Sequence, residues 1–142
     1  MPDPNSPDDW RALALRQEAS ARHLLDGAFT GDAFFHAGIS VEAMLKAAVM
    51  KHEGLNRWPD RSDRRELYSH NLVRLAGLAG VEIFDLAHDP IAPRWQVVRL
   101  WKRAEAYDPA VMPLRVARDM VEAACGSEGV NRWIEHRFRL DR

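Results

Sequence analysis

The stretch from Phe29 to Gly54, FTGDAFFHAGISVEAMLKAAVMKHEG, combines a helical pattern with a low charge. Its apolar residues recur at intervals of three and four positions, which is the period of an apolar face on an α-helix and not that of a strand. These residues are Ala33, Phe34, Ala37, Val41, Met44, Leu45, Ala48 and Val49. The first half of the stretch carries almost no charge on any side, so we expect neighbours to cover it from several directions. We predict that it is the central helix of the fold.

Three polar side chains interrupt this apolar surface, namely His36, Glu42 and Lys46. Glu42 precedes Lys46 by four residues, the favourable order for an ion pair on one helix face. We interpret Glu42 and Lys46 as a structural pair and His36 as a satisfied core residue.

Composition indicates one domain. The chain has 142 residues, of which 46% are hydrophobic, and a formal net charge of −1, so any binding to nucleic acid must use a local basic patch. Cys125 is the single cysteine, which excludes an internal disulfide and a thiolate zinc site and fits a reducing compartment. The acidic start resembles no secretory signal and no apolar run reaches membrane-spanning length, so we expect a cytoplasmic protein that does not bind membranes.

The first helix precedes the central one. Ser6 or Asp8 can cap it, Pro7 is tolerated at its first position, and helical spacing continues to the region of Gly27. Residues 1–6 are expected to form a flexible tail before a domain that spans 7–142. Residues 30–32 read as a short turn, which makes the first two helices an antiparallel hairpin.

The rest of the chain also reads as helical. We expect a polar loop over 55–69, a short helix over 72–78 and a short helical turn within 81–93. A fourth helix is predicted from Ala92 or Arg94 to Tyr107, with Val97, Leu100 and Trp101 on its buried face. A fifth begins near 110–113, and Gly126 to Gly129 either interrupt it or bend it. The predicted fold class is therefore an all-α, single-domain bundle of four to five helices.

The predicted fourth helix carries the most basic surface that the sequence offers. Arg94, Arg99, Lys102 and Arg103 spread over a broad arc with only Glu105 as a nearby acid. This arc is either an ordinary solvated face or, together with the neighbouring tryptophans, a surface for phosphates and bases.

Four segments in a fixed order resemble the HEPN domain, the higher eukaryotes and prokaryotes nucleotide-binding family. The segments are Asp32 to Gly38 (DAFFHAG), Val41 to Ala47 (VEAMLKA), Ser69 to Leu72 (SHNL) and Trp101 to Tyr107 (WKRAEAY). The resemblance covers roughly residues 10–140. It implies a bundle of four or five helices that usually forms homodimers. Members of the family occur in prokaryotic toxin–antitoxin, antiviral and CRISPR systems.

The resemblance also implies two classes of function. Many members are metal-independent ribonucleases, with an arginine followed after four to six residues by a histidine on a late helix. Others have lost this motif and bind nucleotides or partner proteins, often beside a nucleotidyltransferase. Histidine and arginine suit RNA cleavage because the first moves protons near neutral pH and the second stabilises phosphate charge.

The spacing of arginine and histidine favours the second class. Arg65 and His70 have four residues between them, but they lie at a loop and at the start of the third helix, where His70 is readily a capping and packing residue. Arg132 and His136 lie late in the chain with only three residues between them, which does not match.

We therefore expect a nucleotide-, RNA- or partner-binding module of a defence or toxin–antitoxin system, without an intact ribonuclease motif and without a metal or cofactor. Its expected nucleotide or RNA contacts are Arg99, Lys102, Arg103 and Tyr107. A metal-independent ribonuclease that uses Arg65 and His70 is the alternative, and a structural subunit of a larger assembly is the second.

Overall fold

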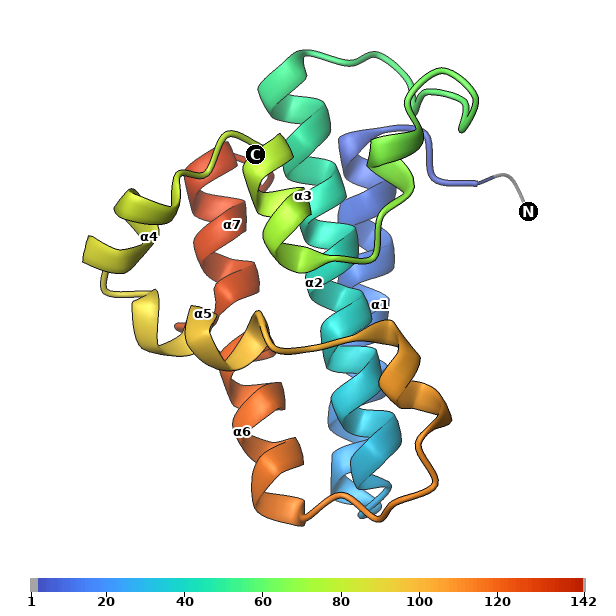
Figure 1. The fold of residues 1–142 in the computed structure, drawn as a ribbon, viewed down its shortest axis with the longest axis vertical. Helices are drawn as coiled ribbons and strands as arrows, with labels where there is room; N and C mark the ends of the chain where they lie inside the picture. Colours follow the sequence, from blue (N-terminus) through green and yellow to red (C-terminus); the bar gives the residue numbers. More distant parts are fainter. Residues whose placement is uncertain (1–2, 142) are drawn as a thin grey trace.

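The computed structural model describes residues 3–141, apart from the side chain of Tyr107. This part of the chain is all-α, as predicted, and contains no strand (Figure 1). Seven α-helices and two short 3-10 helices occur in it, more than the four to five helices expected. The α-helices are α1 (Pro7–Asp26), α2 (Thr30–Glu53), α3 (Leu72–Leu78), α4 (Ile83–His88), α5 (Ala92–Val98), α6 (Leu114–Cys125) and α7 (Val130–Phe138), and the 3-10 helices are η1 (Arg65–Tyr68) and η2 (Arg103–Tyr107).

Helices α1 and α2 form the predicted antiparallel hairpin (Figure 1). The Oγ atom of Ser6 accepts a hydrogen bond from the backbone N–H of Asp9 at 3.1 Å and so caps α1, with Pro7 at its first position. The predicted turn at 30–32 is wrong, because α2 begins at Thr30 without a side-chain cap. The Thr30 hydroxyl instead donates to the carbonyl oxygen of Met112 at 2.7 Å, which ties the start of α2 to the distant segment before α6.

The chain before α1 is only partly described, since Met1 and Pro2 lie outside the described residues. Asn5 is hydrogen-bonded through both its backbone and its side chain. Its backbone N–H donates to the Asp9 carboxylate at 3.0 Å, and its side-chain oxygen accepts from the backbone N–H of Trp58 at 2.9 Å. The predicted flexible tail is therefore anchored at Asn5.

Helix α2 is the centre of the fold. Every residue from Ser40 to Met50 is buried, because α1, α3, α6, α7 and η2 all pack against this helix (Figure 1). Gly54, with φ of 66°, ends it in the left-handed conformation that glycine adopts most readily. By length and composition alone α2 could cross a membrane, but 78% of its most apolar window is buried inside the protein.

The helix predicted from Ala92 or Arg94 to Tyr107 does begin at Ala92, but its predicted continuation to Tyr107 is wrong. Helix α5 ends at Val98, and the chain then crosses the face of α2 before η2 begins at Arg103 (Figure 1). Leu100, which the helical period placed on the buried side, is 63% exposed, whereas Trp101 is 3% exposed. The indole of Trp101 turns inward onto α2 because Gly38 has no side chain: a Cβ atom there would lie 2.1 Å from the ring.

The glycines from Gly126 to Gly129 break the last helix and do not merely bend it. Helix α6 ends at Cys125 and α7 begins at Val130. The tight connection leaves no room for a Cβ atom at Gly129, where it would lie 2.8 Å from the carbonyl oxygen of Ala123. The predicted helix over 72–78 and the helical turn within 81–93 are confirmed as α3 and α4, while the predicted loop over 55–69 contains η1.

Candidate functional site

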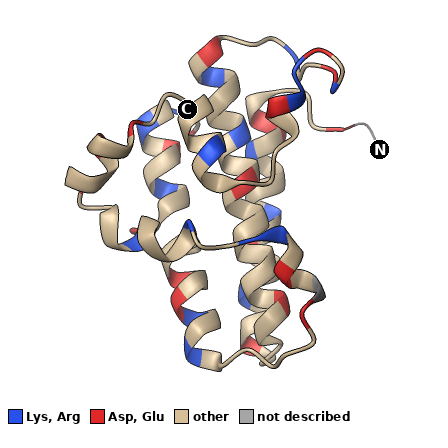
Figure 2. Cartoon of the chain, viewed as in Figure 1, with Lys and Arg blue, Asp and Glu red and all other residues tan. Residues whose placement is uncertain are grey.

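A cavity of about 390 Å³ lies where η1 meets the start of α3, and we call it the arginine pocket. Two segments that are separate in the sequence contribute its three exposed arginines. Its lining consists of Arg61, Arg65, Glu66, Tyr68, Ser69 and Arg74. Figure 2 marks Lys and Arg positions in blue in the loop before η1 and on α3.

Local hydrogen bonds hold the pocket in shape. The Tyr68 hydroxyl donates to the carbonyl oxygen of Pro59 at 2.7 Å, which closes the loop before η1. Arg64 donates from both terminal nitrogens to the two carboxylate oxygens of Glu53, at 2.8 and 3.0 Å, and so fastens the loop to the end of α2. The Asn71 side chain accepts from the backbone N–H of Arg74 and caps α3, so the capping role proposed for His70 belongs to Asn71.

The charge of the pocket is positive because its acid is already paired. Glu66 lies 2.5 Å from Nε of Arg64, and hydrogen bonding to Arg64 lowers the pKa of the Glu66 carboxyl below its usual range. Arg61, Arg65 and Arg74 form no ion pair within residues 3–141. The guanidinium carbon of Arg61 lies 5.7 Å from the centre of the Tyr68 ring, in cation–π range.

His70 points to a different partner. Its Nδ1 atom lies 2.8 Å from Oε1 of Glu42, and Oε2 of Glu42 lies 3.3 Å from Nζ of Lys46. Lys46 is buried beside two indoles that contact each other, with Nζ 5.2 Å from the Trp10 ring centre and 5.9 Å from that of Trp58. His70 does not line the arginine pocket, so the described structure does not bring the predicted pair of Arg65 and His70 to one cavity.

The predicted contacts Arg99, Lys102, Arg103 and Tyr107 do not share one helical face, because the helix that was to carry them is broken. Arg99 donates to the side-chain oxygen of Gln96 at 2.7 Å. Lys102 lines a separate cavity beside the start of α2, and the guanidinium carbon of Arg103 lies 5.9 Å from the Phe35 ring centre. The side chain of Tyr107 lies outside the described part of the structure.

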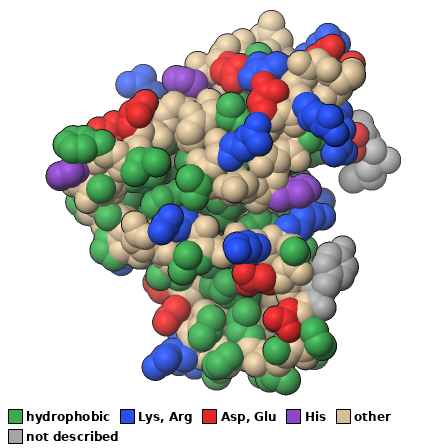
Figure 3. Space-filling model, viewed as in Figure 1, with side chains coloured by type: hydrophobic (Ala, Val, Ile, Leu, Met, Phe, Trp, Pro, Cys, Tyr) green, Lys and Arg blue, Asp and Glu red, His purple; other side chains and the backbone are tan. Residues whose placement is uncertain are grey.

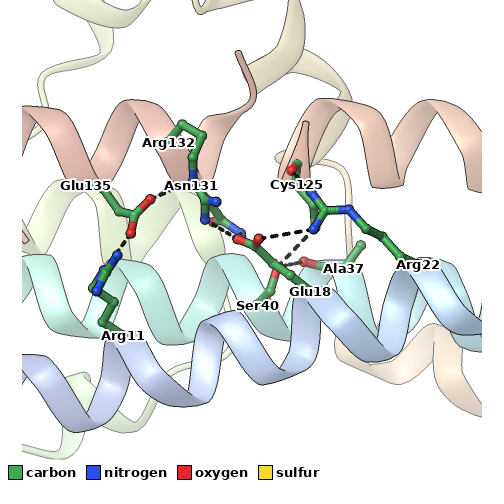
Figure 4. A network of polar contacts seen from close by, with 9 residues as sticks. All are labelled: Arg11, Glu18, Arg22, Ala37, Ser40, Cys125, Asn131, Arg132 and Glu135. Atoms are coloured by element: carbon green, nitrogen blue, oxygen red, sulfur yellow. Dashed lines mark hydrogen bonds and ion pairs between the residues drawn. The ribbon is translucent and has the colours of Figure 1, made fainter. Parts of the chain in front are cut away.

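A buried polar network joins α1, α2, α6 and α7, and sequence reasoning missed it (Figure 4). Nδ2 of Asn131 donates to Oε2 of Glu18 at 2.8 Å and to Oγ of Ser40 at 2.9 Å. Arg132 also binds Glu18, at 2.5 Å, and Glu18 itself is 2% exposed. Burial raises the pKa of the Glu18 carboxyl although Arg132 and Asn131 oppose this. The only sequence signal was the spacing of four between Glu18 and Arg22, which is common on helices.

Arg132 and His136 line one cavity of about 560 Å³ together with Arg94, although their spacing did not match the ribonuclease motif. Arg132 already forms ion pairs with carboxylates of the protein itself. It is paired with Glu18, and its Nε atom lies 2.6 Å from Oε1 of Glu135, without the alignment of a hydrogen bond. Glu135 also pairs with Arg11 of α1. Arg132 and Glu135 together therefore join α7 to α1.

Residues 3–141 contain no group of three or more histidine, cysteine, aspartate or glutamate side chains that could hold a metal ion. No protein-family model, curated protein or solved structure matches the chain. The resemblance to the HEPN family therefore stays a prediction from the sequence pattern.

Proposed function

We propose that this protein is a HEPN-like binding module of a prokaryotic defence or toxin–antitoxin system, which binds the phosphates of RNA or of a nucleotide in the arginine pocket. The observation that supports this is the convergence of Arg61, Arg65 and Arg74 around Tyr68, without an ion-pair partner among the described residues.

The chemistry of these side chains suits a phosphate backbone. Guanidinium groups bind phosphate oxygens in a two-pronged geometry and lose less hydration than ammonium groups do. The half-buried ring of Tyr68 adds a surface on which a base stacks without regard to its identity. Because the whole chain has a net charge of −1, binding depends on this patch and not on the overall charge of the molecule.

A direct test is the binding of a short fluorescein-labelled single-stranded RNA, followed by anisotropy over a range of salt concentrations. Arg65→Gln and Arg74→Gln should each weaken binding and lower the slope of log affinity against log salt by about 0.7, the value for one lost contact to a single-strand phosphate. Arg118→Gln is the matched control, since Arg118 is an exposed arginine on α6 far from the pocket in sequence and should change neither quantity. Equal losses in all three variants would refute the proposed site.

A metal-independent ribonuclease is the second candidate, and one observation favours it. The contact between His70 and Glu42 is an imidazole held by a carboxylate, which is the arrangement that orients a general base, and the His70 side chain is 48% exposed. Cleavage of total RNA in EDTA that disappears in His70→Ala and in Arg65→Ala, with helicity unchanged by circular dichroism, would establish the enzyme. RNA that stays intact at every protein concentration would refute the ribonuclease and favour the binding module.

The proposed module acts as a homodimer, and a nucleotidyltransferase or another defence protein is its proposed partner. Sedimentation equilibrium of the purified chain tests the first statement. Co-purification with the product of a neighbouring nucleotidyltransferase gene tests the second.

A further inference from the structure

A second cavity, of about 420 Å³, lies at the opposite end of α2 from the arginine pocket, and we call it the aromatic cavity. It is bounded by the first turns of α2, by Trp101 to Ala106, and by the segment that leads from η2 to α6. This end of the molecule is at the bottom of Figures 1 and 3, where hydrophobic side chains gather between acidic ones.

Three aromatic side chains form an apolar part of the lining of this cavity. Phe34 and Phe35 are half-buried and project from the first turns of α2, while the buried indole of Trp101 is held by its close packing on Gly38. The rim includes exposed apolar side chains: Phe29 is 60% exposed and Val111 is 91% exposed. Exposed aromatic and aliphatic side chains around a concave surface are typical of a ligand site.

The charges around this apolar lining are mainly negative. Three carboxylates, those of Asp32, Glu105 and Asp108, line the cavity against a single ammonium group, that of Lys102. None of the three forms an ion pair with a described residue, and Asp108 uses one oxygen to accept the backbone N–H of Ala110 at 2.9 Å. Arg103 does not line the cavity, although its guanidinium lies over the ring of Phe35.

We infer that the aromatic cavity binds a small organic cation, with an ammonium group carried on an apolar aryl or alkyl body. The faces of aromatic rings attract cations, and unpaired carboxylates at the rim of the cavity add a second attraction. A cavity of this volume lies within the range of small-molecule sites. The same carboxylates repel phosphates, so this site is independent of the proposed binding of RNA or nucleotide at the arginine pocket.

Titration with phenethylamine, followed by heteronuclear NMR of the isotope-labelled full chain, tests the inference. Saturable shifts are expected for the backbone N–H of Gly31 and the indole N–H of Trp101, both of which belong to residues that line the cavity. Phenethyl alcohol has the same apolar body without the charge and should bind about tenfold more weakly, while phenylacetate should not bind.

The variant Asp32→Asn combined with Glu105→Gln should weaken phenethylamine about tenfold and leave phenethyl alcohol unchanged. Asp119→Asn, which removes an exposed carboxylate on α6 outside the cavity, is the matched control and should bind as the wild type does. Because all three side chains are exposed, these substitutions should preserve the fold, which circular dichroism checks. Equal affinity for the amine and the alcohol, an unchanged affinity in the double variant, or no saturable shift with any probe would overturn the inference.

Discussion

Nδ2 of Asn131 lies 2.8 Å from Oε2 of Glu18, and this contact joins the last helix of the fold to the first (Figure 4). Both side chains are buried, and Arg132 binds the same carboxylate oxygen. A buried carboxylate is costly unless it is paired and hydrogen-bonded, and here neighbours from α7 supply both kinds of partner. Replacing Glu18 with alanine should therefore remove the carboxylate that Asn131 and Arg132 share and lower the free energy of unfolding by about 3 kcal/mol, measured by urea denaturation.

The pH dependence of stability should also report on Glu18. Its pKa is raised in the folded protein, chiefly by burial, so between the unfolded and folded pKa values the folded state binds more protons than the unfolded state. The contribution of this group to stability therefore grows as the pH falls through the folded pKa, and it is complete below the unfolded value of 4.5. Relative to Glu18→Gln, the wild type should gain stability as the pH is lowered from 7 toward 4.5. A gap between the two proteins that stays constant over this range would contradict the prediction.

Gly38 should tolerate no side chain. A Cβ atom there would lie 2.1 Å from the Trp101 ring, inside any permitted contact, so Gly38→Ala should lower the free energy of unfolding by about 1 to 3 kcal/mol as the indole is displaced. Gly77→Ala is the control, because a Cβ atom at Gly77 in α3 meets nothing within 4 Å. That substitution should raise stability by about 0.5 to 1 kcal/mol through helix propensity. Thermal unfolding measures both variants. A loss of stability in Gly38→Ala alone shows that the clash with Trp101, and not glycine replacement in general, is the cause.

The ion pair of Glu42 and Lys46 should be strongly coupled. Both side chains are buried, so Lys46→Met leaves the Glu42 carboxylate with only His70 as a partner and should lower stability by about 3 kcal/mol. Adding Glu42→Gln removes the stranded charge and should recover part of the loss. Urea denaturation of both single variants and of the double variant measures the coupling, and strictly additive losses would argue against it.

Cys125 should be unreactive in the native protein. Its side chain is buried beside Ser40, with the two polar atoms 3.6 Å apart, and burial raises the pKa of the thiol to about 11. The thiolate, which is the reactive form, is therefore scarce at neutral pH. A thiol reagent at pH 8 should modify the protein only as fast as it unfolds, so the rate should rise with urea in parallel with the loss of helical circular dichroism. Rapid modification without urea would show that the thiol is accessible.

The elements with a strong apolar period were predictable from the sequence. The sequence predicts the central helix, the first helix with a cap at Ser6 or Asp8, and the short helix over 72–78, because periodicity, capping residues and glycines act locally. The helix predicted to end at Tyr107 is too long, because the apolar period of the sequence continues past Val98 whereas the chain leaves the helix there. What ended it was the close fit of Trp101 onto Gly38, two residues that lie 63 positions apart in the sequence.

The candidate site shows the same division. Arg65 and His70 were identified from their spacing, but spacing does not reveal that Arg65 joins Arg61 and Arg74 while His70 joins Glu42. The sequence by itself determined an all-α protein around one apolar helix, since helical periodicity is a property of neighbouring residues. Only the tertiary structure decided which charges are paired, as with Glu18 and Asn131, and which stay free to meet a ligand, because burial and pairing depend on contacts between distant segments.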